Sequence, residues 1–222
     1  MADEQDLIWN HLDLRKMLEQ IGIDFGGGMP SAAYEKEEVP DQPKGMPSDK
    51  PEPVITENNI RELWKTADET VDWTDALAHD KPSDGLTGKN LWSFYHGIAE
   101  KVLSGDHEAY TEVLKTSNPL KDLVCYADGI SIQILSADRL RSTFICKDEL
   151  MNENRKLYLA GMGLRIARDL LACLPVKEVE VTAEQEGKTV FSATYQRQQL
   201  LHRSFAFINP IMLADEIGAK FE

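Results

Sequence analysis

The chain has 222 residues, of which 42% are hydrophobic and 28% are charged. These proportions are ordinary for a folded protein of one or two domains, and they exclude a collagen-like repeat, a wholly disordered chain and a disulfide scaffold. The formal net charge is −14, which opposes binding to nucleic acid or to an anionic membrane surface. We therefore expect no nucleic-acid partner and no membrane partner.

The acidic excess lies in the first hundred residues, which hold 21 acidic and 9 basic side chains. The first residues, Met-Ala-Asp-Glu-Gln-Asp, lack the basic and apolar regions of a secretory signal. Three cysteines, Cys125, Cys146 and Cys173, form no CxxC pair, which is typical of reduced thiols. These features predict a cytoplasmic protein.

Residues 5–21 are predicted to form an amphipathic helix that ends at Gly22. Its apolar residues recur at spacings of three, four and seven, with an aromatic side chain among them: Leu7, Ile8, Trp9, Leu12, Leu14, Leu18 and Ile21. The segment 26–55 holds three consecutive glycines and six of the ten prolines, a composition that favours a linker. The predicted organisation is an N-terminal helix (1–25), an acidic Pro/Gly-rich linker (26–55) and a domain (56–222).

The predicted domain begins with helices between residues 57 and 116. The strongest pattern covers residues 90–103, and Asp106 is placed to cap the helix that follows. Asn118 and Pro119 then predict a turn. Alternation of Ile130, Ile132 and Ile134 with polar residues predicts a strand, which pairs as a hairpin with residues 140–146.

A long apolar helix is predicted for residues 148–174, ending before Pro175. A second hairpin follows, with strands 178–184 and 188–195 and a turn at Glu186 and Gly187. The predicted fold class is α+β: a helical N-terminal half followed by ββαββα, with an antiparallel sheet packed on the long helix. Helices from residues 57–116 are expected to cover the other face of that helix.

Two glycines inside the predicted long helix, Gly161 and Gly163, carry a further structural signal. Each costs about 1 kcal/mol of helix stability relative to alanine. Their presence therefore predicts that a neighbouring strand or helix approaches closely at these positions.

The sequence carries no recognisable catalytic motif. The glycines at 26–28 lack the lysine and flanking strand of a P-loop, no GxSxG occurs, and the five histidines show no metal-binding spacing. We therefore predict no catalytic residue, no metal site and no cofactor.

One alternative is a metal-dependent hydrolase or nuclease. Glu178, Glu180 and Glu184 would project from one strand face, separated by about 6.6 Å for each two-residue step. Glu186 and Lys188 form the ExK sequence motif that is found in some metal-dependent nucleases. A solvated strand face and a hairpin turn explain the same residues, and we favour this explanation.

Arg165 and Asp169 stand four residues apart in the predicted long helix, with Arg168 beside them. This spacing is typical of an exposed helix pair. If the stripe were buried, it could form an anion site.

The leading hypothesis is a non-enzymatic protein-interaction module that docks through its tethered N-terminal helix. The predicted partner is another protein or a second copy of the chain. The predicted partner-binding residues are Leu7, Trp9, Leu14, Leu18 and Ile21. Docking of the helix on its own body stays open, as does a second alternative, an acidic nucleic-acid mimic that binds a basic protein.

Overall fold

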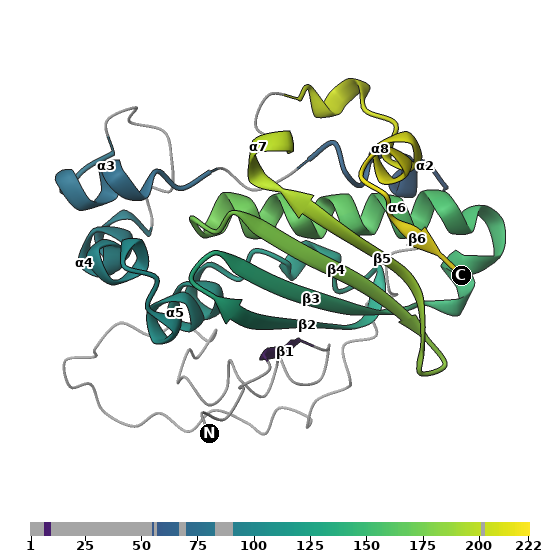
Figure 1. Cartoon of the computed structure of the whole chain (residues 1–222), viewed down its shortest axis with the longest axis horizontal. Coiled ribbons are helices and arrows are strands. Elements are labelled where there is room, and N and C mark those ends of the chain that lie inside the picture. Colours follow the sequence, from purple (N-terminus) through teal and green to yellow (C-terminus); the bar gives the residue numbers. More distant parts are fainter. Residues whose placement is uncertain (1–6, 10–54, 56, 67–69, 83–90, 201–202) are drawn as a thin grey trace, which may run out of the picture.

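A long helix, α6 (Asp148–Cys173), lies across one face of a β-sheet, and α2 (Glu57–Glu62) and α8 (Pro210–Glu216) pack on its opposite side (Figure 1). The structure is a computed structural model that describes residues 7–9, 55, 57–66, 70–82, 91–200 and 203–222. The helix α6 is interrupted by a kink at Asn154, whose φ and ψ of −147° and 58° are not helical, and its part after the kink is about 28 Å long and runs along the sheet. The α+β class is confirmed.

Three further helices stand together at one end of the sheet (Figure 1). They are α3 (Trp73–Ala78), α4 (Trp92–Leu103) and α5 (His107–Ser117). The predicted cap of α5 is confirmed, because the Asp106 carboxylate accepts a hydrogen bond from the Ala109 amide at 2.9 Å. The outer side of α6 is thus covered by α2 and the C-terminal α8. The expected cover by helices from residues 57–116 is confirmed for α2, whereas α3, α4 and α5 close one end of the sheet.

Over the described residues, the sheet has six strands in the order β1-β2-β3-β4-β5-β6. Their bounds are β1 (Leu7–Trp9), β2 (Ala127–Ser136), β3 (Arg139–Cys146), β4 (Glu178–Gln185), β5 (Lys188–Gln196) and β6 (Lys220–Phe221). Three short helices lie in the connections between these elements. They are the 3-10 helices η1 (Lys121–Leu123) and η2 (Phe205–Phe207) and the α-helix α7 (Arg197–Leu200).

The prediction that the sheet is antiparallel is wrong at its centre, where β3 and β4 pair in parallel. Each predicted hairpin is antiparallel, as expected. The helix α6 returns along the sheet between the two hairpins, so β4 starts at the same end as β3 and must run in the same direction when it pairs with it. The sheet is therefore mixed.

The turn of the second hairpin forms where predicted. Glu186 and Gly187 have φ values of 51° and 74°, in the left-handed region. Two successive positive φ values match the twist of a two-residue hairpin, and glycine adopts this backbone without steric cost. The turn residues thereby set the register of β4 and β5.

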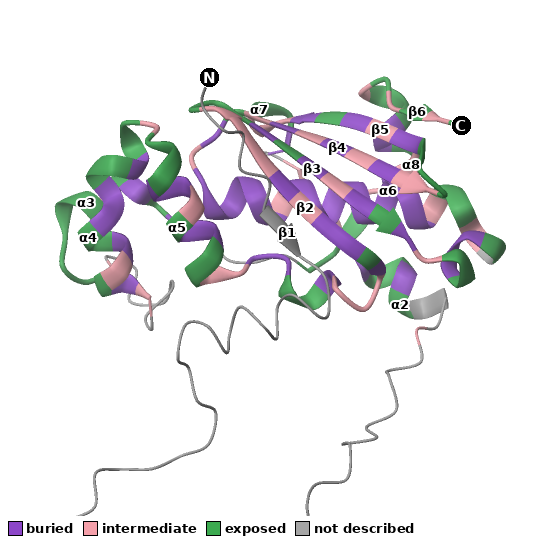
Figure 2. Cartoon of the chain, turned by 90° about the horizontal axis from the view of Figure 1, so that it is seen from below, coloured by how far each residue is buried: buried purple, intermediate pink, exposed green. Residues whose placement is uncertain are grey.

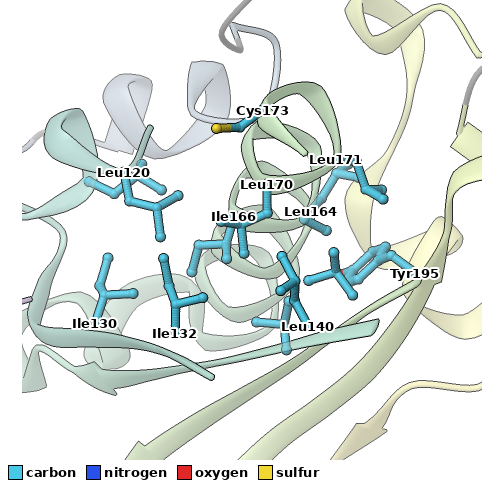
Figure 3. Close-up of a cluster of buried hydrophobic side chains, with 14 of the residues drawn as sticks. Leu120, Ile130, Ile132, Leu140, Leu164, Ile166, Leu170, Leu171, Cys173 and Tyr195 are labelled. Carbon is cyan, nitrogen blue, oxygen red and sulfur yellow. The ribbon is translucent and has the colours of Figure 1, made fainter. Parts of the chain in front are cut away.

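The core fills the space between the sheet and α6 (Figure 3). The strands alternate buried and more exposed residues, so that one face is apolar and the other is open to solvent (Figure 2). Ile132 of β2, Leu140 of β3 and Leu170 of α6 are all at most 1% exposed. The close approaches expected at the two glycines are present: a Cβ at Gly163 would lie 2.7 Å from Cε1 of Phe191, and one at Gly161 would lie 3.1 Å from Cε3 of Trp64.

Candidate functional site

The sheet edge beside β2 holds a short strand from the distant N-terminal part of the chain. β1 pairs antiparallel with β2, with Leu7 in register with Ile132 and Trp9 in register with Ile130. Ile130 and Ile132 are buried and point toward α6 (Figure 3). Because directly paired residues of antiparallel strands share a face, backbone positions 7 and 9 fall on the core side of the sheet.

The predicted N-terminal helix is wrong over Leu7–Trp9, which form a strand. The local sequence Leu-Ile-Trp combines β-branched and aromatic residues that fit a pleated surface. The edge strand β2 offers unpaired backbone groups with which Leu7–Trp9 can form hydrogen bonds. An isolated helix, by contrast, must first form an energetically unfavourable nucleus. Two of the predicted docking residues, Leu7 and Trp9, thus lie at the edge of the protein's own sheet, and the other three, Leu14, Leu18 and Ile21, lie outside the described residues.

The carboxylates proposed for metal-dependent hydrolysis are ion-paired with arginines of the neighbouring strand. The parallel register places Arg139 opposite Glu178 and Arg141 opposite Glu180. Nε of Arg139 is 2.7 Å from Oε1 of Glu178, and Nε of Arg141 is 2.9 Å from Oε2 of Glu180. Arg139 also bonds Glu180. These guanidinium groups stand where a metal ion would have to approach, so the arrangement disfavours the hydrolase alternative.

The remaining residues of that alternative are separate from this ladder of charges. Glu184 is half-buried near the end of β4, Glu186 is in the exposed hairpin turn, and Lys188 is the exposed first residue of β5. Over the described ranges, no three His, Cys, Asp or Glu side chains gather closely enough to hold a metal ion. The sequence signal for this ion pairing is the two-residue spacing of Arg139 and Arg141, which matches that of Glu178 and Glu180.

The polar stripe of α6, expected to be exposed, is buried in part. Arg165 and Asp169 are 4% and 0% exposed, and Nε of Arg165 donates to Oδ2 of Asp169 at 2.6 Å. Nη1 of Arg165 donates to the Thr66 hydroxyl at 2.5 Å. The next arginine, Arg168, bonds the carbonyl oxygen of Trp64. Both arginines thus tie α6 to the segment that follows α2, and of the two only Arg165 is buried, whereas Arg168 is half-buried.

A cleft of about 380 Å³ opens beside this arginine, between α2, η1 and α6. One wall is formed by α2 and the residues after it, including Glu62, Leu63 and Thr66. The opposite wall includes Asp122 of η1 and the two residues before β2, Cys125 and Tyr126. Arg165 completes the lining. Its volume suits a small molecule.

The cleft contains polar groups with hydrogen-bonding capacity to spare. Nη2 of Arg165 lies 3.7 Å from Oδ2 of Asp122, which is an ion-pair distance beyond that of a hydrogen bond. Within the described part of the chain, Nη2 of Arg165 and the hydroxyl of Tyr126 donate no hydrogen bond. These two donors are therefore available to a ligand.

Burial raises the pKa of the Cys125 thiol and of the Tyr126 phenol, although the positive charge of Arg165 acts on Tyr126 in the opposite direction. Both groups are therefore protonated at neutral pH. Burial also raises the pKa of Cys146 to about 12. A protonated thiol is a weak nucleophile, so neither cysteine is activated for covalent chemistry.

The chain shows no match to known proteins: no protein-family model, no curated protein and no solved structure matches it. Among the described helices, none combines the length and the apolar character needed to cross a membrane. The β2 edge and the cleft beside Arg165 are the two features of the described structure that could receive a partner or a ligand.

Proposed function

We propose that this protein is a non-enzymatic interaction module whose β2 edge receives an extended peptide segment. The observation that carries the proposal is the antiparallel pairing of Leu7–Trp9 with residues 130–132 of β2. A strand that joins a sheet edge gains its affinity from backbone hydrogen bonds and its specificity from alternate side chains. In this proposal the protein's own strand β1 is the resident strand on the β2 edge. A strand of a partner protein or of a second copy displaces it.

The edge is longer than its resident strand. β2 has ten residues, and β1 pairs with three of them. Among the residues that the structure describes, no strand pairs with the remainder of β2 on the β1 side. A longer incoming strand would thus form more backbone hydrogen bonds than β1 does, which supports exchange in favour of a partner.

The sequence between β1 and the body supports competition. The Pro/Gly-rich composition of residues 26–55 is that of a tether. A short flexible tether holds its two ends at an effective concentration in the mM range. The tethered β1 strand would then compete with any partner strand for the β2 edge. Only a partner that binds the edge tightly enough to displace β1 would form a complex.

The test uses the full-length chain with a protease site inserted within residues 26–55. Cleavage makes the N-terminal segment a separate molecule, and a fluorescein-labelled peptide of residues 1–20 then reports on the vacated edge. The labelled peptide should bind the cleaved chain more tightly than the uncleaved chain, and hydrogen exchange of β2 amides should slow when it binds.

The matched control is the same peptide with Ile8→Pro, because proline cannot donate to a strand ladder and restricts the backbone. The proline peptide should bind at least tenfold more weakly, which corresponds to a loss of about 1.4 kcal/mol. Equal binding of the two peptides would refute docking by strand addition. A partner captured from a lysate of the source organism should be released by the 1–20 peptide and retained in the presence of the proline peptide.

A further inference from the structure

The buried arginine beside the cleft has an unequal distribution of hydrogen bonds. Its Nε and Nη1 atoms are used within the protein, on Asp169 and Thr66, whereas Nη2, 3.7 Å from the cleft residue Asp122, has no hydrogen bond to any described residue. The Arg165 side chain is 5% exposed. A buried guanidinium N–H without an acceptor is costly, and a ligand oxygen in the cleft would satisfy it.

A second donor lies close to the first. Tyr126 also lines the cleft, and the charge of Arg165 acts on the pKa of its phenol, so the two groups are electrostatic neighbours. A guanidinium and a phenol in the lining of one cleft suit a carboxylate, which accepts charge-assisted hydrogen bonds on both oxygens. The two donors therefore favour a ligand that carries a carboxylate group.

The surrounding charges disfavour a simple anion. The positive charge of Arg165 is already balanced by the buried Asp169 carboxylate. Asp122 adds a second negative charge at the rim, where its side chain is 61% exposed. A bare anion would meet this carboxylate at short range, whereas a ligand that also carries an ammonium group would pair with it.

We propose that the cleft binds a free α-amino acid, with its carboxylate on Nη2 of Arg165 and the Tyr126 hydroxyl and its ammonium group on Asp122. The separation of Nη2 and the Asp122 carboxylate, 3.7 Å, suits a ligand whose two charged groups are bonded to the same carbon atom. The cleft volume of about 380 Å³ leaves room for a side chain against Leu63 and Leu123. This site is separate from the β2 edge, and the proposal does not depend on strand exchange.

Cys125 provides a local reporter, because it lines the cleft and is partly exposed, whereas Cys146 and Cys173 are buried. The experiment measures the alkylation rate of Cys125 by N-ethylmaleimide in the full-length chain, using mass spectrometry, with each free L-amino acid added singly. An amino acid that binds should slow alkylation in a saturable way, by about tenfold at about ten times its Kd. Absence of protection by every amino acid would overturn the proposal.

Derivatives of the protecting amino acid test each charge. The N-acetyl derivative lacks the ammonium group and the carboxamide lacks the carboxylate, so each should lose most of the protection. Equal protection by the N-acetyl derivative would show a carboxylate site only, and equal protection by the carboxamide would show an amine site only. Either result would refute binding of a zwitterion.

Two variants keep the test independent of folding. Asp122→Asn changes an exposed side chain and Tyr126→Phe removes one hydroxyl, and each should raise the Kd by about tenfold, read as the ratio of alkylation rates with and without ligand. The matched control is Asp138→Asn, which removes an exposed carboxylate paired with Lys177 and absent from the cleft lining. An unchanged Kd in both cleft variants would contradict the proposal.

Discussion

Arg165 and Asp169 form an ion pair inside the protein, one helical turn apart on α6, with Nε of Arg165 2.6 Å from Oδ2 of Asp169. The exposed fractions of the two side chains are 5% and 0%. Arg165 extends the pair to Thr66, so the ion pair also fastens the segment that follows α2. Arg165 therefore both holds this segment against α6 and lines the cleft.

Removal of one partner of this pair should be strongly destabilising. Asp169→Asn leaves the Arg165 charge buried without its carboxylate, and breaking a buried pair in this way costs about 3–5 kcal/mol. Urea denaturation monitored by tryptophan fluorescence would measure the loss in the free energy of unfolding. The double substitution Arg165→Met with Asp169→Leu removes both charges and should cost less than the single one. A loss below about 1 kcal/mol for Asp169→Asn, the value of an exposed pair, would show that the pair is solvated.

Substitution of Gly163 by alanine should destabilise the protein although alanine favours helices. The new Cβ would lie 2.7 Å from Cε1 of Phe191 and 2.9 Å from Oη of Tyr195, inside the packed core. Overpacking of this kind costs about 1–3 kcal/mol, more than the helix propensity returns. Thermal unfolding would report the change. Gly161→Ala is the matched comparison and should cost less, since the nearest atom to its Cβ is in the ring of Trp64, at 3.1 Å. A Gly163→Ala protein as stable as the wild type would show that β5 can move away.

Arg197 should stabilise the C-terminal end of α6. Its Nε donates to the carbonyl oxygen of Val176 at 2.7 Å, and its Nη2 bonds those of Leu171 and Leu174. The last carbonyls of a helix lack partners within the helix, and a cation there also interacts favourably with the helix dipole. Arg197→Met keeps the apolar stem and removes these bonds, so the free energy of unfolding should fall by about 2–3 kcal/mol.

Arg203→Met is the control for this prediction, and chemical denaturation would compare the two variants. Arg203 pairs with Glu216 at the surface, where solvent screens the interaction, so loss of this pair should change the free energy of unfolding much less than Arg197→Met does. Equal losses for the two variants would contradict a special role of Arg197 in ending α6.

Stability should fall in alkaline solution because of buried acids with raised pKa values. Burial raises the pKa of Cys146 from 9.0 to about 12 and also raises that of Tyr158 and Tyr195. Below pH 9 the thiol is protonated in both the folded and the unfolded state. Between about pH 9 and 12 only the unfolded state releases the proton, so Cys146 lowers the free energy of unfolding by up to about 1.4 kcal/mol per pH unit.

Urea denaturation across this alkaline range would measure the slope of stability against pH. Cys146→Ala removes one buried acid and should make the slope shallower, whereas the two tyrosines continue to contribute at the upper end of the range. An identical slope in the wild type and the variant would show that the Cys146 thiol titrates equally in both states.

Most of the secondary structure follows from signals that act over a few residues. Alternation of apolar residues gives β2 and β3, and the positive φ values of Glu186 and Gly187 realise the predicted turn between β4 and β5. The C-terminal limit of α6 follows in the same way, since Leu174 adopts an extended backbone before Pro175. Periodicity and turn preferences depend on residues that are close in the sequence. The elements that they specify can therefore be predicted without knowledge of the tertiary structure.

The candidate sites depend on contacts between distant segments. The spacing of Arg165 and Asp169 is that of any surface pair, and only the cover provided by the segment after α2 buries it. Glu180 forms its ion pair because α6 returns the chain so that β4 runs parallel to β3. The strand formed by Leu7–Trp9 likewise needs the vacant edge of β2, more than 100 residues away. Local chemistry set the elements and their ends, whereas burial, charge pairing and strand partners were decided in the tertiary structure, because they depend on which distant surfaces meet.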